Sequence, residues 1–196
     1  MISQILVYWT FTQLQPTLAL HLESYGYSGA FIGFSFAIPT LIYASTSPLI
    51  YILTERLRKS AVIMFGYSIA SLAMFIVGTS SLFLIPNNPE AVVLGLAFLG
   101  FGCGMINIPV LPDMIESVEQ VYPALNDSEL NNHISGLFIA CQGIGETIGP
   151  IFGSTAANLY GFRHTQEIIA FTLMTYMILY FLFCGRTQIF AFNKTE

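Results

Sequence analysis

The chain has 196 residues, of which 55% are hydrophobic and only 9% are charged, and its formal net charge at pH 7 is −5. Soluble domains carry roughly 25% charged residues, so this composition, with a mean hydropathy of +0.70, excludes an ordinary soluble domain and indicates an integral membrane protein. The acidic balance gives no support for nucleic-acid binding, which needs basic surfaces.

Six apolar runs are each long enough to cross a hydrocarbon core of about 30 Å as a helix of about 20 residues. Because backbone groups in lipid must be satisfied within their own segment, we expect every run to be α-helical. The sequence therefore predicts an all-α membrane protein with six transmembrane helices. The predicted helices are residues 2–22, 30–53, 61–85, 91–111, 134–158 and 165–185, and residues 112–133 are predicted to form a long polar loop.

Two polar residues, Gln13 and Gln15, and the helix breaker Pro16 interrupt the first run near its middle. Discontinuous helices line substrate sites in many transporters, so Gln13 and Gln15 could hydrogen-bond a substrate; equally, they could tie this helix to its neighbour. Tyr8 and Trp9 precede them by a turn or so. Their rings could form a cation–π wall for an amine, although packing is the favoured interpretation.

Basic residues set the expected orientation. If the N-terminus is cytoplasmic, the opposite side of the membrane holds only Arg163. We therefore predict that both termini and residues 112–133 are cytoplasmic. The basic residues on the cytoplasmic side are then Arg56, Arg58, Lys59, Arg186 and Lys194.

Asn107 lies close to the end of the fourth run, before Pro109 and Pro112. The prolines loosen this part of the helix and permit bending, which would make Asn107 part of a moving site; a plain helix end is the alternative. Tyr43, in the second run, is open to the same two interpretations as Tyr8.

The fifth run combines a ridge of small residues with an acid at its midpoint. Such ridges let helix backbones approach closely in lipid. Gln142 and Glu146 are four residues apart and share one face. A carboxylate at mid-bilayer costs about 2.5–3.5 kcal/mol on insertion scales and marks a functional site by default, so Glu146 is predicted to bind a proton or a cation; a structural hydrogen bond to another helix is the alternative. The ridge consists of Cys141, Gly145, Gly149, Gly153 and Ala157.

A short internal repeat links the two halves of the chain. The second run opens with Ser28-Gly29-Ala30-Phe31-Ile32, and the fifth opens with Ser135-Gly136-Leu137-Phe138-Ile139. Because the two runs enter the membrane from opposite sides, the repeat predicts two inverted three-helix units, as in each half of a major facilitator.

The inventory of reactive residues argues against an enzyme. His21, His133 and His164 lie at the ends of separate runs, and the sequence has no His-Glu-x-x-His or phosphate-binding motif. We expect no cofactor and no metal site.

Two motifs resemble those of the major facilitator superfamily. The basic stretch resembles the loop motif Gly-x-x-x-Asp-Arg-x-x-Arg-Lys, with Tyr51 in place of the leading glycine; the fifth run resembles the antiporter motif Gly-x-x-x-Gly-Pro-x-x-Gly-Gly, with Ser154 in place of the last glycine. The chain therefore resembles the C-terminal six-helix half of such a transporter. The matching residues are Glu55, Arg56, Arg58 and Lys59 in the loop, and Gly145, Gly149, Pro150 and Gly153 in the helix.

Within the superfamily, residues 107–116, the stretch 129–138 and Gly161-Phe162-Arg163 resemble the vesicular amine transporter family, and within it the polyamine type. The resemblance implies alternating access between two six-helix halves, usually driven by proton exchange, in a vesicular, endomembrane or plasma membrane. It implies a small organic cation and protons as ligands, and a partner that is either the N-terminal half or a second copy. A half-length protein that does not transport but modulates a full-length relative is the alternative.

Overall fold

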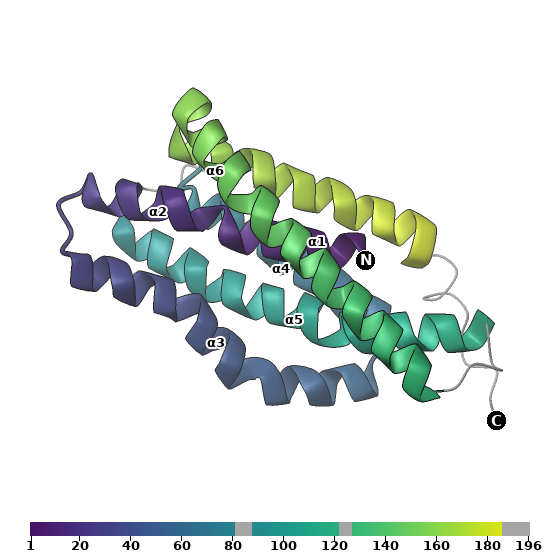
Figure 1. Ribbon diagram of the computed structural model, residues 1–196. Helices are drawn as coiled ribbons and strands as arrows, with labels where there is room; N and C mark the ends of the chain where they lie inside the picture. Colours follow the sequence, from purple (N-terminus) through teal and green to yellow (C-terminus); the bar gives the residue numbers. More distant parts are fainter. Residues whose placement is uncertain (81–87, 122–126, 186–196) are drawn as a thin grey trace.

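The computed structural model describes residues 1–80, 88–121 and 127–185, with side chains described for 1–80, 88–121 and 130–183. Within these ranges the secondary structure is entirely helical (Figure 1). Four segments are long and apolar enough to cross a membrane: Gly29–Arg56, Lys59–Val77, Pro89–Val121 and Leu130–Phe183. The helices are α1 (Ile2–Thr12), α2 (Leu14–Glu23), α3 (Gly29–Arg56), α4 (Lys59–Val77), α5 (Pro89–Val121), α6 (Asp127–Tyr180) and the π-helical η2 (Phe181–Gly185).

The predicted first helix, residues 2–22, is divided into α1 and α2 at Gln13. Pro16 has no N–H to bond the carbonyl of Thr12, and its ring crowds that carbonyl. Gln13 itself keeps a right-handed helical conformation and donates its N–H to Trp9 O at 3.1 Å. The break is therefore local, and the interruption lies where the sequence predicts it.

The prediction of a loop over residues 112–133 is wrong at both ends of this range, where the chain is helical. α5 continues through Pro112 to Val121, and α6 begins at Asp127; residues 122–126 lie outside the described part of the chain. Polarity ends a transmembrane segment but not a helix, because charged residues such as Glu116 have good helix propensity. An ion pair between Glu116 and Lys59, at the start of α4, holds this extension against its neighbour.

The link between the fifth and sixth predicted helices is shorter than expected. α6 runs from Asp127 to Tyr180 and is interrupted only at Gly161, where φ is 82° and ψ is 163°. Figure 1 shows α6 doubling back on itself, and Gly161 is the residue within it whose backbone is not helical. Residues 159–164, predicted to be a loop, therefore belong to two helices joined by one glycine.

α4 also ends earlier than the predicted range 61–85. It stops at Val77, Gly78 caps it, and Thr79 has a positive φ of 44°. Polar contacts from α6 to Thr79 and Ser80 hold this end, and residues 81–85 lie outside the described part of the chain.

The core lies between α4, α5, α1–α2 and the second part of α6. α4 and α5 approach closely where Gly66 and Gly102 face one another: a Cβ added to either would lie 3.0–3.1 Å from the carbonyl oxygen of the other. Tyr67, fully buried, donates its hydroxyl hydrogen to Ser3 O at 3.0 Å and so joins α4 to α1.

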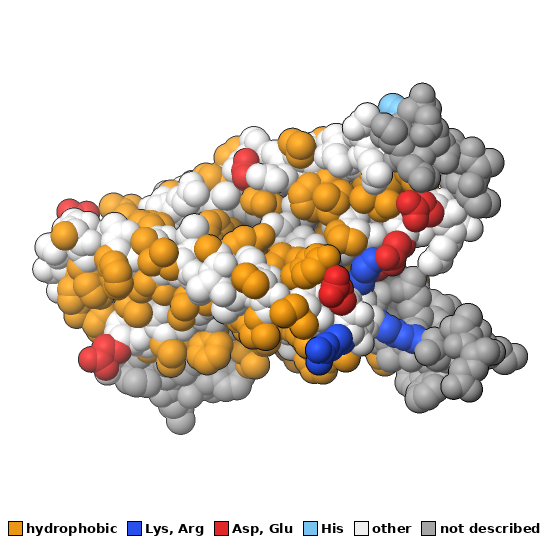
Figure 2. All heavy atoms as spheres, turned by 90° about the horizontal axis from the view of Figure 1, so that it is seen from below, with side chains coloured by type: hydrophobic (Ala, Val, Ile, Leu, Met, Phe, Trp, Pro, Cys, Tyr) orange, Lys and Arg blue, Asp and Glu red, His pale blue; other side chains and the backbone are white. Residues whose placement is uncertain are grey.

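Outside the core, apolar side chains cover the length of the bundle, and the Lys and Arg side chains visible on the face in Figure 2 gather at one end. Glu55, Arg56 and Arg58 are exposed at the junction of α3 and α4, and Lys59 begins α4. Arg186 and Lys194, which were also used to predict the orientation in the membrane, lie outside the described residues.

Candidate functional site

The glycine ridge of the fifth predicted helix packs directly on α1. A Cβ added at Gly145 would lie 2.5 Å from Ile5 O, and one added at Gly153 would lie 2.4 Å from Gln13 O. At Gly149 the obstacle would be the hydroxyl oxygen of Thr12, at 2.0 Å. Only glycine allows this approach, which fixes the first part of α6 across the break between α1 and α2.

Glu146 comes directly after Gly145, the first glycine of this ridge, and its side chain is exposed. Its Oε1 accepts a hydrogen bond from Gln142 Nε2 at 2.9 Å, so the two residues share one face as the sequence predicts. The residue before Glu146, Gly145, packs against Tyr8: a Cβ added there would lie 3.0 Å from Tyr8 Cβ. Pro150 lies in the same helix, one residue after Gly149, and is half-buried.

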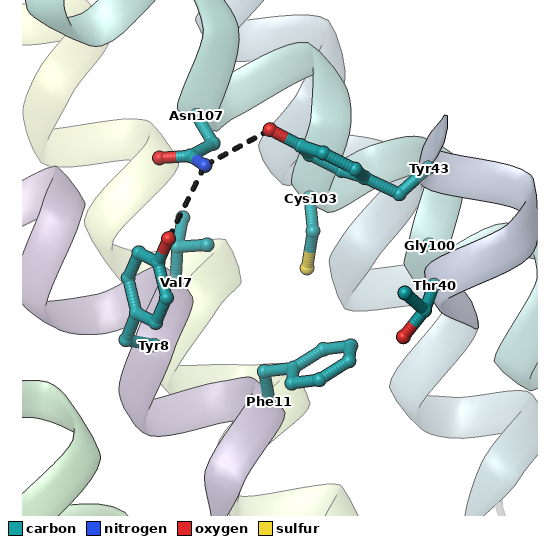
Figure 3. A pocket seen from close by; sticks show the side chains of 8 residues that line it. All are labelled: Val7, Tyr8, Phe11, Thr40, Tyr43, Gly100, Cys103 and Asn107. Atoms are coloured by element: carbon teal, nitrogen blue, oxygen red, sulfur yellow. Dashed lines mark hydrogen bonds between the residues drawn. The ribbon is translucent and has the colours of Figure 1, made fainter. Parts of the chain in front are cut away.

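Tyr8 opens onto a cavity of about 200 Å³ between α1, α3 and α5 (Figure 3). α3 and α5 meet beside it because Gly100 leaves room for the backbone of Pro39; a Cβ there would lie 2.2 Å from Pro39 O. The wall is mainly apolar, with polar groups at a few points. The lining residues are Val7, Tyr8, Phe11, Thr40, Tyr43, Gly100, Cys103 and Asn107.

Asn107 is the polar centre of this cavity. Its Nδ2 donates to the hydroxyl of Tyr43 at 3.1 Å and to that of Tyr8 at 3.4 Å (Figure 3). Its Oδ1 is buried and has no hydrogen-bond partner among the described residues. The amide nitrogen of Asn107 thus bonds both tyrosines, while Oδ1 points away from the cavity (Figure 3).

Gln15 lies at a neighbouring hollow of about 420 Å³, which shares Phe11 and Thr40 with the first cavity. Gln13 faces elsewhere: it is fully buried and its Nε2 donates to Gln166 Oε1 at 2.8 Å. The predicted pair of glutamines is therefore split between a hollow and a helix–helix contact.

Trp9 also turns away from the cavity. Its ring packs edge-on against Phe152 of α6, with the ring centroids 5.0 Å apart. The favoured packing interpretation fits Trp9, whereas Tyr8 and Tyr43 line the cavity.

The structure adds two residues that sequence reasoning did not select, Gln166 and Glu167. Both are buried in the second part of α6. The sequence feature that could have indicated them is their position, because they are two consecutive polar residues at the start of the sixth predicted helix.

Comparison with known proteins identifies the family. The family model described as Major Facilitator Superfamily matches residues 1–195. The chain is similar to the MFS-type transporter SLC18B1 of Mus musculus, with 30% identity over 76% of this chain and 33% of the relative. It is also similar to SLC18B1 of Homo sapiens, with 31% identity over 79% of this chain and 34% of the relative.

The chain thus spans about one third of the length of the curated relatives it matches. No solved structure gives a significant match. The matches support the resemblance to the vesicular amine transporter family that the motifs indicate, and the family model covers nearly the whole sequence. The chain belongs to the major facilitator superfamily.

Proposed function

We propose that the chain is the C-terminal half of a secondary transporter that exchanges a small organic cation, such as a polyamine or a monoamine, for protons. The observation that carries the proposal is the cavity itself, whose wall combines the rings of Tyr8, Phe11 and Tyr43 with the side-chain amide of Asn107. A mainly apolar wall with a few polar groups suits a small ligand that has an apolar chain and a few hydrogen-bonding groups.

The surroundings of Asn107 also suit a positive charge. The rings of Tyr8, Tyr43 and Phe11 line the cavity, and aromatic faces attract ammonium groups by about 0.5–2 kcal/mol. Glu146, the residue after Gly145, which packs against Tyr8, would supply the opposite charge. In this proposal the carboxylate of Glu146 holds either the cation or a proton. This competition couples the transport of the cation in one direction to the transport of protons in the other.

The exposure of Glu146 supports the proposed partner. A carboxylate that faced lipid would be costly, whereas one that faces a second protein surface lines a central pathway. We infer that the N-terminal half, or a second copy of the chain, covers this face of α6. Gln142 then orients the carboxyl toward the shared pathway.

The proposed membrane arrangement has six spans in two inverted units. The first unit is α1–α2, α3 and α4; the second is α5 and the two parts of α6 on either side of Gly161. Both termini would be cytoplasmic, with the Lys59–Glu116 pair at the cytoplasmic end. Rocking of this half against its partner would expose the cavity alternately to the two sides.

Binding is the first test, because it does not require a complete translocation pathway. The purified protein in lipid nanodiscs should bind tritiated spermidine, and excess monoamine should compete, whereas a diol of similar length should not. Glu146→Gln should weaken binding at least tenfold, and Glu90→Gln, an exposed acid on another helix, should not. Equal competition by the diol would contradict recognition of a cation.

Transport is the second test. Vesicles that contain the protein should accumulate the bound cation when their interior is acidic, and Glu146→Gln should abolish this accumulation while the protein still reaches the membrane. Normal proton-driven uptake by Glu146→Gln would contradict its role. Binding without transport, together with a native band near 21.6 kDa on an immunoblot, would favour the half-length modulator.

A further inference from the structure

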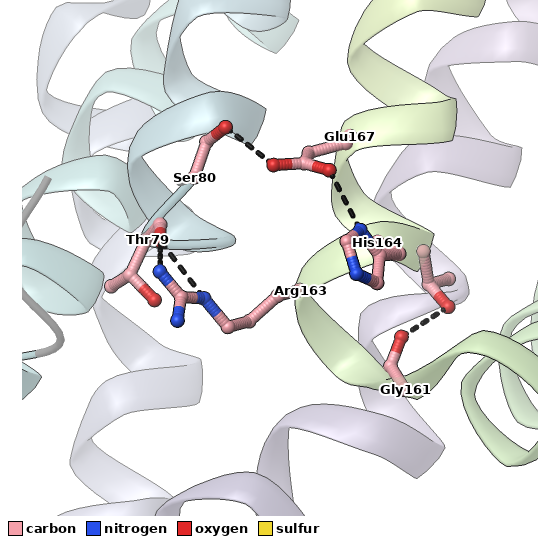
Figure 4. Close-up of polar contacts among 7 residues, drawn as sticks. Thr79, Ser80, Gly161, Arg163, His164 and Glu167 are labelled. Atoms are coloured by element: carbon pink, nitrogen blue, oxygen red, sulfur yellow. Dashed lines mark hydrogen bonds and ion pairs between the residues drawn. The ribbon is translucent and has the colours of Figure 1, made fainter. Parts of the chain in front are cut away.

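A second carboxyl group, Glu167, is held inside the bundle at the end opposite the Lys59–Glu116 pair. Its side chain is only 10% exposed. Oε1 accepts a hydrogen bond from Ser80 Oγ at 2.5 Å, and Oε2 lies 2.9 Å from His164 Nδ1 (Figure 4). Burying a carboxylate is costly unless it is paired, so this arrangement stabilises a charge that an apolar site would exclude.

His164 connects the buried carboxyl with the solution. Its side chain is 66% exposed, although it contacts a carboxyl group that is 10% exposed. Histidine is the side chain whose charge ordinarily changes between pH 5 and 8. An imidazole at this position can take a proton from the solution at one nitrogen and release one toward Glu167 from the other.

Ser80 allows Glu167 to hold that proton. A hydroxyl can donate or accept, whereas an ionised carboxyl can only accept and a protonated one can donate. In the structure the hydroxyl of Ser80 donates to Oε1. When Glu167 gains a proton from His164, the proton binds at Oε2, 2.9 Å from His164 Nδ1, while the Ser80 hydroxyl continues to donate to the other oxygen, Oε1, so neither residue needs to move. One O–H bond forms at Glu167 Oε2 and one N–H bond breaks at His164 Nδ1, while a proton from the solution forms an N–H bond at His164 Nε2.

Among the described residues, we identify charged or titratable neighbours on two elements. On α6, Arg163 donates from Nε and Nη2 to the carbonyl oxygen of Thr79 (Figure 4), and His164 contacts Glu167 directly. On α2, His21 stacks on Phe162 with 4.0 Å between the ring centroids, within reach of the charge of Arg163. Thr79 and Ser80, which follow the end of α4, do not titrate.

The residue before Glu167 connects this cluster with the candidate transport site. Gln166 exchanges hydrogen bonds with Gln13 at the break between α1 and α2. Tyr8, at the cavity, lies on α1 just before that break. A change in charge at Glu167 therefore occurs on a helical turn that is hydrogen-bonded to the substrate-bearing helix.

We propose that Glu167 and His164 form a proton-binding site separate from Glu146, which carries a second proton in the exchange. The proton-binding step stands on the geometry of Glu167, His164 and Ser80. Its part in exchange rests on the transport function proposed above. Each proton coupled to exchange raises the attainable accumulation of substrate about tenfold for a gradient of one pH unit.

Infrared difference spectroscopy tests proton binding without any need for transport. As the pH of the protein in nanodiscs is lowered, the C=O stretch of a protonated carboxyl should appear. This band should be lost in Glu167→Gln, shifted in Glu167→Asp, and retained in Glu90→Gln. A spectrum that is unchanged by either Glu167 variant would overturn the proposal; if Glu167→Gln does not fold, the aspartate variant decides.

Transport measurements then test the second proton. Glu167→Gln should bind spermidine and exchange internal for external spermidine at wild-type rates, while its accumulation under a gradient of one pH unit falls about tenfold. Unchanged accumulation, or equal loss of exchange and accumulation, would contradict the coupling role. A wild-type protein that shows the Glu167 band but neither binds nor exchanges cations would instead disprove the proposed transport function alone.

Discussion

Gln13 and Gln166 exchange hydrogen bonds through their side-chain amides in the fully buried interior, at 2.8 Å in one direction and 3.4 Å in the other. The pair joins the break between α1 and α2 to the second part of α6. Each amide satisfies the other in surroundings where an unpaired polar group is costly. The break thus has a fixed partner and is a defined structural feature rather than a frayed end.

The first prediction concerns this pair. Gln13→Leu or Gln166→Leu alone should lower the free energy of unfolding by about 1–3 kcal/mol, because the remaining amide is left buried and unpaired. The double variant should recover part of the loss, with a coupling energy of about 0.6–1.7 kcal/mol. Reversible unfolding in detergent, measured for all four proteins, checks this. Strictly additive effects would show that the amides do not depend on one another.

The second prediction concerns the contact between α1 and α6. Gly153→Ala would place a methyl group 2.4 Å from Gln13 O, and a backbone carbonyl cannot move aside as a side chain could. We expect a loss of about 1–3 kcal/mol, seen as a lower midpoint of thermal unfolding. Gly143→Ala is the matched control on the same helix, since no atom lies within 4 Å of its added Cβ. If the two variants were equally stable, the close approach would be wrong.

The third prediction separates hydrogen bonding from charge at the cavity. Asn107→Leu removes the side-chain amide from the cavity wall, so a ligand with ammonium N–H groups should bind about 5–150-fold more weakly, the equivalent of about 1–3 kcal/mol. A quaternary ammonium ion of similar size, which has no N–H, should lose little affinity. Competition binding with both ligands provides the measurement. A parallel loss for both would point to a change in cavity shape instead of a lost hydrogen bond.

The fourth prediction concerns the ion pair between Lys59 and Glu116. The side chain of Glu116 is 56% exposed, so water and salt screen the attraction, and we expect the pair to contribute only about 0–1 kcal/mol. Lys59→Glu should destabilise slightly by like-charge repulsion, and the exchanged pair Lys59→Glu with Glu116→Lys should restore the wild-type value. Thermal unfolding at low and high salt would measure this. A large effect that persists in high salt would contradict a screened pair.

Much of the architecture could be predicted from local sequence. Hydropathy located the apolar runs, Pro16 located the break in the first helix, and the spacing of Gly145, Gly149 and Gly153 indicated a close helix contact that α1 provides. These features depend on residues near one another in the chain, where periodicity and proline chemistry are informative.

The remainder depends on residues far apart in the chain. Asn107 gains its role from Tyr8 and Tyr43, which lie on other helices, so the sequence left a plain helix end as an alternative. The partner of Gln13 is 153 positions away. The extension of α5 past Pro112 escaped prediction because hydropathy marks where a membrane segment ends and not where a helix does.

The single-residue reversal at Gly161 has a consequence for inherited variation. Its backbone, with φ of 82° and ψ of 163°, occupies a region essentially reserved for glycine. No atom lies within 4 Å of an added Cβ, so backbone conformation alone restricts this position. Missense alleles at codon 161 should therefore be far more damaging than the open space around the residue suggests, whereas alleles at the equally open Gly143, which is helical, should be tolerated.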